Sequence, residues 1–198
     1  MNNSFFNPIE CGQTLPQNNI HAVSVSMPTL QDVIDYEEQT PEILEKITIA
    51  YPRFVMHPYL KILAKHIKEK YAINEAYEVV LLSSQKAVEV VSSKYFIHNK
   101  IEINEPFGVI LVQNGTSQLQ KVLKFIQHVG YNLSSRLAQD YLYKEGLIAT
   151  KHIEEYLDED IAYNSLTKAL AVAYKQPKNN VCLTPSGMNA VYCALRVI

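Results

Sequence analysis

The sequence predicts an α/β protein in which mainly parallel strands alternate with flanking helices. Two continuous apolar runs, YEVVLLSS at 77–84 and FGVILVQ at 107–113, have the composition of buried strands. Each is followed by a segment with helical periodicity, at 85–96 and at 117–130. A further strand is expected at 179–185. Continuous apolar strands that alternate with helices are typical of a parallel sheet covered on both faces, which gives the predicted fold class.

The remainder of the chain indicates an N-terminal arm followed by helices. The arm, residues 1 to about 28, is polar, aperiodic and interrupted by prolines, and HAVSVSMP is a possible strand within it. The expected helices are Leu30–Glu38, Pro41–Ala50 with Thr40 as N-cap, the run YLKILAKHIKEKY after Pro58, 134–146 and Ile153–Tyr174. We therefore expect an arm with short helices at 1–57 and an incomplete α/β domain at 58–198.

Composition excludes several classes of protein. Apolar residues make up 47% of the chain and charged residues 19%, with a formal net charge of -2, so neither a nucleic-acid partner nor a membrane span is expected. The N-terminus has no basic segment followed by an apolar one, so no secretory signal is expected. Cys11, Cys182 and Cys193 show no CxxC spacing, and Cys182 falls on the predicted strand at 179–185. These features predict a cytoplasmic protein without disulfides.

Metal sites and catalytic side chains are not predicted from these residues alone. Ser134 is expected to cap the helix that follows it. The acidic segment 154–164 is expected to be a solvated surface. The histidines show no ligand spacing and are expected to be polar residues with hydrogen-bond partners rather than metal ligands; they are His21, His57, His66, His98, His128 and His152.

The segment LTPSGMNAVY joins a predicted strand to a predicted helix through a turn of small residues. The first N–H groups of a helix have no intrahelical partner, and together with the helix dipole they can bind an anion. Gly187 would let a ligand approach the backbone, and Ser186 could cap the helix or donate its hydroxyl. Most such junctions bind nothing, so the residues alone leave a plain turn and a phosphate site both open. No Walker or GxGxxG pattern is present.

The same segment resembles the Ser-Gly-Met segment of the Cys/Met-metabolism family of pyridoxal-phosphate enzymes, which includes cystathionine γ-synthase. The resemblance implies the first part of a fold-type I, aminotransferase-like large domain, with pyridoxal 5′-phosphate as cofactor. It also implies that the amides of Gly187 and Met188 bind the cofactor phosphate, with Ser186 at the family's serine position.

AYPRF resembles the family's Tyr-x-Arg segment, which reaches the same phosphate from the neighbouring subunit. The resemblance assigns that contact to Tyr51 and Arg53 and implies a homo-oligomer with shared sites. Pro52 between them, and FVMHPYL after them, depart from many members. HAVSVSMPTLQDVIDYEE and QHVGYNLSSRLAQDYL are most similar to the divergent fungal-type cystathionine γ-synthases. From the residues alone, a surface turn after a helix is the simpler interpretation of Tyr51 and Arg53.

The resemblance implies an enzyme of transsulfuration in methionine and cysteine metabolism. Its substrate would be a small amino acid, and its reaction γ-replacement on an activated homoserine or cleavage of a C–S bond. The family's Schiff-base lysine comes well after the Ser-Gly-Met turn, so we expect an N-terminal portion, inactive alone and with no catalytic residue of its own. Residues 77–143 would be an accessory insertion. The alternative is a non-catalytic α/β domain for binding or oligomerisation, without cofactor.

Overall fold

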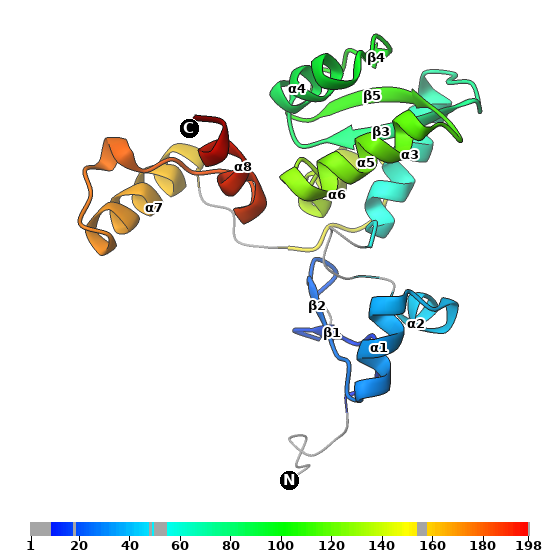
Figure 1. Ribbon diagram of the computed structural model, residues 1–198, viewed down its shortest axis with the longest axis horizontal. Helices are drawn as coiled ribbons and strands as arrows, with labels where there is room; N and C mark the ends of the chain where they lie inside the picture. The colour runs from blue at the N-terminus through cyan, green and yellow to red at the C-terminus, as the bar shows by residue number, and fades with distance from the viewer. Residues whose placement is uncertain (1–8, 18, 48, 50–54, 154–157, 198) are drawn as a thin grey trace. The chain divides into compact units, whose positions relative to one another are not determined.

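A computed structural model gives the structure of the chain (Figure 1). The residues it describes are 9–17, 19–47, 49, 55–153 and 158–197. Tyr51 and Arg53 lie outside the described residues. By its internal contacts the chain divides into two compact units, Met1–Lys151 and His152–Ile198, and each is described by itself. The predicted boundary near residue 57 and the predicted insertion are not tested by this division and stay predictions.

The first unit begins with a hairpin and two short helices. Strand β1 (Thr14–Leu15) pairs antiparallel with β2 (Ser24–Val25), which confirms a strand within HAVSVSMP. Helix α1 (Leu30–Glu38) has the predicted bounds. Helix α2 (Pro41–Lys46) ends earlier than predicted, because the next residue, Ile47, leaves the helical conformation and is buried in a small apolar cluster.

The main sheet of the first unit is antiparallel. Its strands are β3 (Tyr77–Leu82), β4 (Lys100–Ile101) and β5 (Gly108–Gln113), in the order β3-β5-β4. β5 runs antiparallel to both neighbours. The predicted positions of the two long strands are confirmed, but the prediction of mainly parallel strands is wrong. The short strand β4 reverses the chain between α4 and β5, and so brings β5 back in the opposite direction beside β3.

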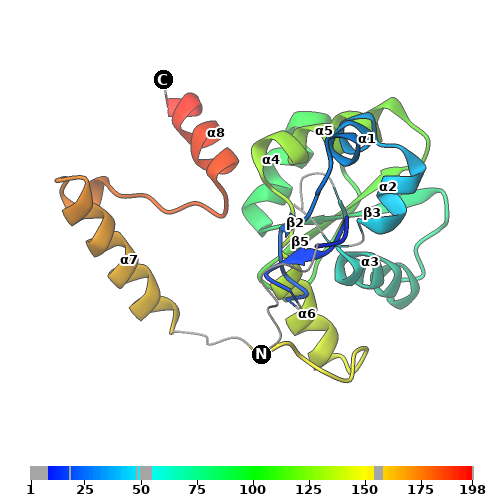
Figure 2. The same cartoon turned by 90° about the horizontal axis from the view of Figure 1, so that it is seen from below.

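Helices cover both faces of this sheet (Figure 2). On one face Val79 and Leu81 pack with the helices α3 and α6, and on the other Val80 and Leu82 pack with α4 and α5. Because the strands are buried on both faces, their sequences are continuous runs of apolar residues. The bounds of these helices are α3 Pro58–Lys70, α4 Gln85–Tyr95, α5 Ser117–Val129 and α6 Ser135–Lys144.

Local signals in the sequence set the ends of these helices. The hydroxyls of Ser84, Thr116 and Ser134 each accept the backbone N–H three residues further on, so each is the N-cap of α4, α5 or α6. This confirms the prediction for Ser134. Gly130 ends α5 in the left-handed conformation, with φ of 70°, as its position after the apolar run predicts.

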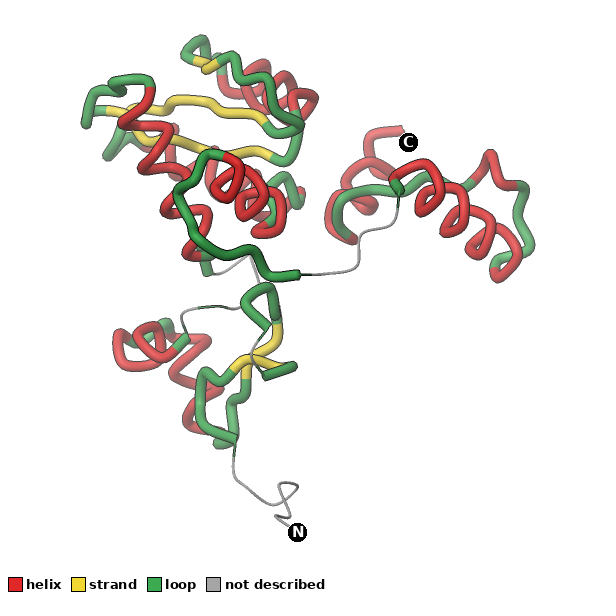
Figure 3. Tube along the Cα trace, turned by 180° about the vertical axis from the view of Figure 1, so that it is seen from behind, coloured by secondary structure: helices red, strands yellow, loops and turns green. Residues whose placement is uncertain are grey.

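The second unit is helical in its described residues (Figure 3). It contains α7 (Glu159–Ala173), a 3₁₀ turn at Lys178–Asn180 and α8 (Gly187–Val197). The strand predicted at 179–185 does not form, and Cys182 is exposed rather than buried. An isolated strand leaves its backbone groups unpaired, and the described part of this unit offers no second strand to pair with it.

Membrane insertion has no candidate in the described residues. No helix there combines the length and the apolar character that crossing a bilayer requires.

Candidate functional site

The turn before α8 is fixed by hydrogen bonds centred on Ser186. The Ser186 hydroxyl accepts the N–H of Asn189 at 3.1 Å, and the Ser186 carbonyl accepts the N–H of Ala190 at 3.0 Å. The Thr184 hydroxyl donates to the same carbonyl at 2.8 Å. Ser186 is therefore the N-cap of α8, and the described part of the chain holds no acceptor for its hydroxyl proton.

The amides of Gly187 and Met188 are open at this helix start. They precede the first residue whose N–H is capped, and no described residue accepts a hydrogen bond from either of them. Gly187 is exposed, and a Cβ placed on it would meet no atom within 4 Å. An anion could approach both N–H groups here without displacing a side chain, and the helix dipole would favour it.

Tyr51 and Arg53, the predicted partners of this turn, lie outside the described residues. Their predicted contact with a phosphate stays a prediction. Ile47 before this segment and His57 after it are both buried, with 2% and 5% of their surface exposed.

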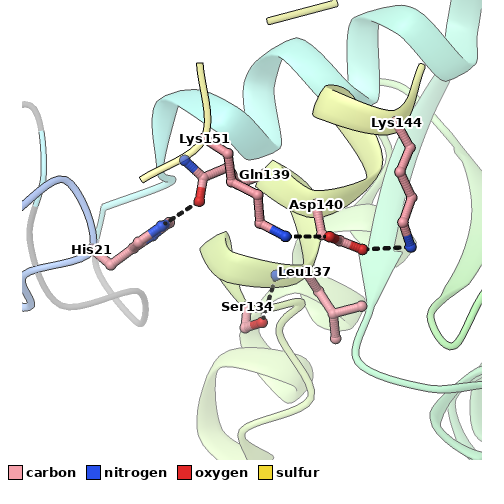
Figure 4. A network of polar contacts seen from close by, with 7 residues as sticks. All are labelled: His21, Ser134, Leu137, Gln139, Asp140, Lys144 and Lys151. Atoms are coloured by element: carbon pink, nitrogen blue, oxygen red, sulfur yellow. Dashed lines mark hydrogen bonds and ion pairs between the residues drawn. The ribbon is translucent and has the colours of Figure 1, made fainter. Parts of the chain in front are cut away.

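A buried histidine cluster joins the arm to the sheet domain of the first unit. His21 is hydrogen-bonded through Nδ1 to the Ser135 hydroxyl at 2.9 Å. Through Nε2 it is hydrogen-bonded to the Gln139 side-chain oxygen, also at 2.9 Å (Figure 4). The sequence predicted a hydrogen-bonded histidine at this position, which is confirmed. It did not predict that the partners of His21 would lie on α6, more than a hundred residues away.

His57 forms the second half of this cluster. Its Nε2 lies 2.7 Å from the carbonyl oxygen of Ile20, and its Nδ1 accepts the N–H of Tyr59 at 3.1 Å. Because Nδ1 accepts, Nε2 carries the proton and donates to Ile20, so the imidazole is neutral. Burial, and to a lesser degree the neighbouring His21, lower the pKa of His57, while the Ile20 carbonyl opposes this shift.

Asp140 binds two lysines near the end of the first unit. Its carboxylate lies 2.7 Å from the Lys144 ammonium and 2.5 Å from the Lys151 ammonium (Figure 4). Hydrogen bonds from both lysines hold the pKa of Asp140 below its usual range, and partial burial only partly offsets them. Lys151 is the last residue of the unit, so this contact fixes the chain end to α6. Among the described residues no three His, Cys, Asp or Glu side chains gather as metal ligands.

Comparison with known proteins identifies longer relatives. The L-2-amino-4-chloropent-4-enoate dechlorinase/desaturase of Streptantibioticus cattleyicolor is 34% identical over 183 residues, which are 91% of this chain and 36% of that protein. The cystathionine γ-synthase of Neurospora crassa is 25% identical over 173 residues, 71% of this chain and 27% of that protein. The cystathionine γ-synthase of Saccharomyces cerevisiae is 38% identical over 64 residues, 32% of this chain and 10% of that protein.

The chain therefore spans about a third or less of the length of these relatives. No family model matches the chain. No solved structure matches it either. These relatives confirm the resemblance seen in the motifs: the chain is similar to part of the dechlorinase/desaturase and to parts of fungal cystathionine γ-synthases.

Proposed function

We propose that this chain contributes the phosphate-binding part of a pyridoxal 5′-phosphate enzyme of sulfur amino-acid metabolism. The observation that carries the proposal is the start of α8, where Ser186 caps the helix and leaves the amides of Gly187 and Met188 open. These are the residues to which the family resemblance assigns the cofactor phosphate. The similarity to cystathionine γ-synthases supports an enzyme of this class.

The residues of the turn suit a phosphate group. Two backbone N–H donors, one hydroxyl and the positive end of a helix dipole match a dianion that has several acceptor oxygens. Arg53 and Tyr51 would add a guanidinium and a phenol from a neighbouring subunit of a homo-oligomer. When bound, pyridoxal 5′-phosphate supplies an electron sink for negative charge that develops on an amino-acid substrate.

The proposed substrate is a small amino acid, and the proposed reaction is γ-replacement on an activated homoserine or cleavage of a C–S bond. The names of the relatives support this class, since one acts on an aminochloropentenoate and others synthesise cystathionine. We propose that α8 belongs to a fold-type I large domain in the complete protein. The three cysteines are free thiols, which suits a reducing cytoplasm.

Absorbance spectroscopy of the full-length protein tests the proposal. Protein purified with pyridoxal 5′-phosphate should show an absorbance band at roughly 420 nm that borohydride abolishes. The reason is that enzymes of this family bind the cofactor through a Schiff base to a lysine. The 198-residue chain alone should show no such band. A full-length protein that binds no pyridoxal 5′-phosphate would contradict the proposal.

A further inference from the structure

The first turn of α3 is capped by a histidine. Pro58 has no N–H, and the N–H of Leu60 is bonded to the His57 carbonyl at 2.9 Å. The N–H of Tyr59 is bonded instead to Nδ1 of the His57 ring, at 3.1 Å. His57 is therefore the N-cap of α3 through both its backbone and its ring. A histidine can accept a hydrogen bond in this way only while Nδ1 carries no proton.

The same ring also binds the N-terminal arm. Its Nε2 donates to the carbonyl of Ile20 at 2.7 Å. The next residue, His21, stacks on the His57 ring. It is also hydrogen-bonded to Ser135 and Gln139 of α6. Hydrogen bonds between described residues therefore join the arm to α3 and α6 through these two buried histidines.

A second proton on His57 would break the cap of α3. The proton would bind Nδ1 and turn the acceptor of the Tyr59 N–H into a donor that faces another donor. It would also place a positive charge at the N-terminus of α3, where the helix dipole disfavours a cation. A rotation of the ring that moves Nδ1 away from this N–H also moves Nε2 away from the Ile20 carbonyl, so the arm would lose its contact as well.

The partners of His21 tolerate a second proton. The side-chain nitrogen of Gln139 is 3.4 Å from the Tyr59 hydroxyl, so the Gln139 oxygen accepts the Nε2 proton of His21. Nδ1 of His21 then accepts the hydroxyl of Ser135, which can turn and accept instead when Nδ1 is protonated. His57 is therefore the ring whose hydrogen bonds depend on pH.

Among the described residues, no carboxylate stabilises a protonated His57. The titratable side chains that face its ring are His21 of the arm and Tyr59 of α3, with ring centroids 5.7 Å and 5.1 Å away. The α6 residues that contact His21, Ser135 and Gln139, do not titrate in this range. Burial and the neighbouring His21 hold the pKa of His57 below 6.5, and the Ile20 carbonyl only partly opposes this shift.

We propose that His57 is a pH-dependent switch for the N-terminal arm. With a neutral ring it binds the arm to the start of α3, and with a protonated ring it releases the arm. The sheet and its helices should stay folded in the released state, because the buried residues of their two core clusters lie between Leu60 and Leu142. The switch lies in the first unit and does not depend on the proposed cofactor binding at α8.

Proton linkage gives the size of the effect. His57 in a released arm is surrounded by water and has the ordinary pKa of about 6.5, whereas the docked ring has a lower one. The released state therefore takes up the proton first as pH falls. From about pH 6.5 down to the pKa of the docked ring, the ratio of released to docked arm should rise by up to about tenfold per pH unit.

Chemical modification of His21 in the 198-residue chain measures the release of the arm. Diethylpyrocarbonate modifies neutral imidazoles that it can reach, and His21 is buried while the arm is docked. The rate at His21 is divided by the rate at the exposed His98, because this ratio cancels the pH dependence of the reagent. We expect the ratio to rise about five- to tenfold between about pH 7.5 and 5.5.

Two substitutions of His57 separate the two contacts of its ring. His57→Gln keeps an N–H donor at the place of Nε2 and does not titrate, so the ratio should stay low at both pH values. His57→Asn caps the helix but is too short to reach Ile20, so the ratio should already be high at neutral pH. His66→Gln is the matched control, at a half-buried histidine that packs on Tyr141, and should keep the rise.

Hydrogen exchange in β5 shows whether the sheet stays folded while the arm is released. The amide of Ile110, which pairs with Val80, should keep its protection factor at the lower pH. A loss of this protection in parallel with the modification of His21 would mean that the whole unit unfolds, and would overturn the proposal. A ratio that does not rise in the unaltered chain, a rise that persists in His57→Gln, or a low ratio in His57→Asn at neutral pH would overturn it too.

Discussion

The rings of His21 and His57 stack in the interior of the first unit, with centroids 5.7 Å apart and 21° between their planes. His57 donates a hydrogen bond to the carbonyl of Ile20, and the neighbouring His21 is hydrogen-bonded to Gln139 of α6. These two hydrogen bonds therefore connect the N-terminal arm to both α3 and α6. The arm and the segment QHVGYNLSSRLAQDYL, which includes Gln139, both resemble the fungal-type enzymes, so this contact joins the two segments that carry the resemblance.

The buried His57 predicts that stability falls in mild acid. Its pKa in the folded chain lies below the ordinary value of 6.5, so the unfolded chain takes up the proton first as pH falls. The contribution of His57 to the free energy of unfolding should therefore be constant above pH 6.5. It should then decrease from there down to the folded pKa.

Urea unfolding at several pH values measures this dependence. His57→Gln should flatten the slope between neutral and mildly acidic pH, because glutamine does not titrate. His98→Gln, at an exposed position, is the control and should keep the slope. An unchanged slope in His57→Gln would show that other groups cause it.

Removal of the His21 ring should destabilise the first unit through its partners. Gln139 is fully buried and donates weakly to the Tyr59 hydroxyl at 3.4 Å, so without His21 its oxygen loses its partner. We expect His21→Ala to cost about 1–3 kcal/mol in the free energy of unfolding. His21→Ala combined with Gln139→Ala should cost less than the sum of the single variants. Strict additivity in that cycle would mean that the two side chains are not coupled.

The contact of Asp140 with Lys151 should protect the end of the first unit from proteolysis. Asp140→Asn removes the charge that binds both lysines, so the chain at Lys151 should separate from α6 more often. Trypsin should then cleave after Lys151 faster than in the unaltered chain. Asp160→Asn, near the start of α7, is the control and should not change this rate. Equal rates for both variants would remove the role assigned to Asp140.

Gly108 occupies a position where β5 and α4 touch. A Cβ there would lie 2.1 Å from Cγ2 of Val88 and 3.0 Å from the carbonyl oxygen of Ser84. Gly108→Ala should therefore lower the free energy of unfolding by about 1–3 kcal/mol. Val88→Ala in the same chain should recover part of that loss because it removes the closest clash. No recovery, measured by thermal unfolding, would place the strain elsewhere.

The local parts of the fold could be predicted from the sequence, because local signals specify them. The caps Ser84, Thr116 and Ser134 and the left-handed Gly130 are recognisable within a few residues. The direction of the strands could not be predicted. A strand buried on both faces has the same composition in a parallel and in an antiparallel sheet, and the two-residue strand β4 that decides the direction has no apolar run.

The candidate site was predictable in part. Capping of α8 by Ser186 follows from the small residues of the turn, but the strand expected before it needed a partner strand that local sequence cannot reveal. The contact of His21 with Gln139 joins residues 118 positions apart, which no periodicity indicates. The signal in the sequence was that His21 stands within a segment that resembles the fungal-type enzymes.

Arg53 is expected to contribute to cofactor binding in the full-length protein. A bidentate guanidinium–phosphate contact contributes about 1.5–3 kcal/mol, so Arg53→Ala should lose pyridoxal 5′-phosphate more readily on dialysis. Arg53→Lys should restore only part of the affinity, because an ammonium cannot make the bidentate contact. Unchanged retention in Arg53→Ala would return Arg53 to the surface-turn interpretation.

The most direct measurement is the dissociation constant of pyridoxal 5′-phosphate for full-length protein and its Gly187→Val variant. Valine at the open position should block the approach of the phosphate to the amides of Gly187 and Met188 and weaken binding about tenfold or more. Ala190→Val, at an exposed position of the same helix, should bind as the unaltered protein does. Equal affinity of the Gly187→Val variant and the unaltered protein would contradict the phosphate site at α8.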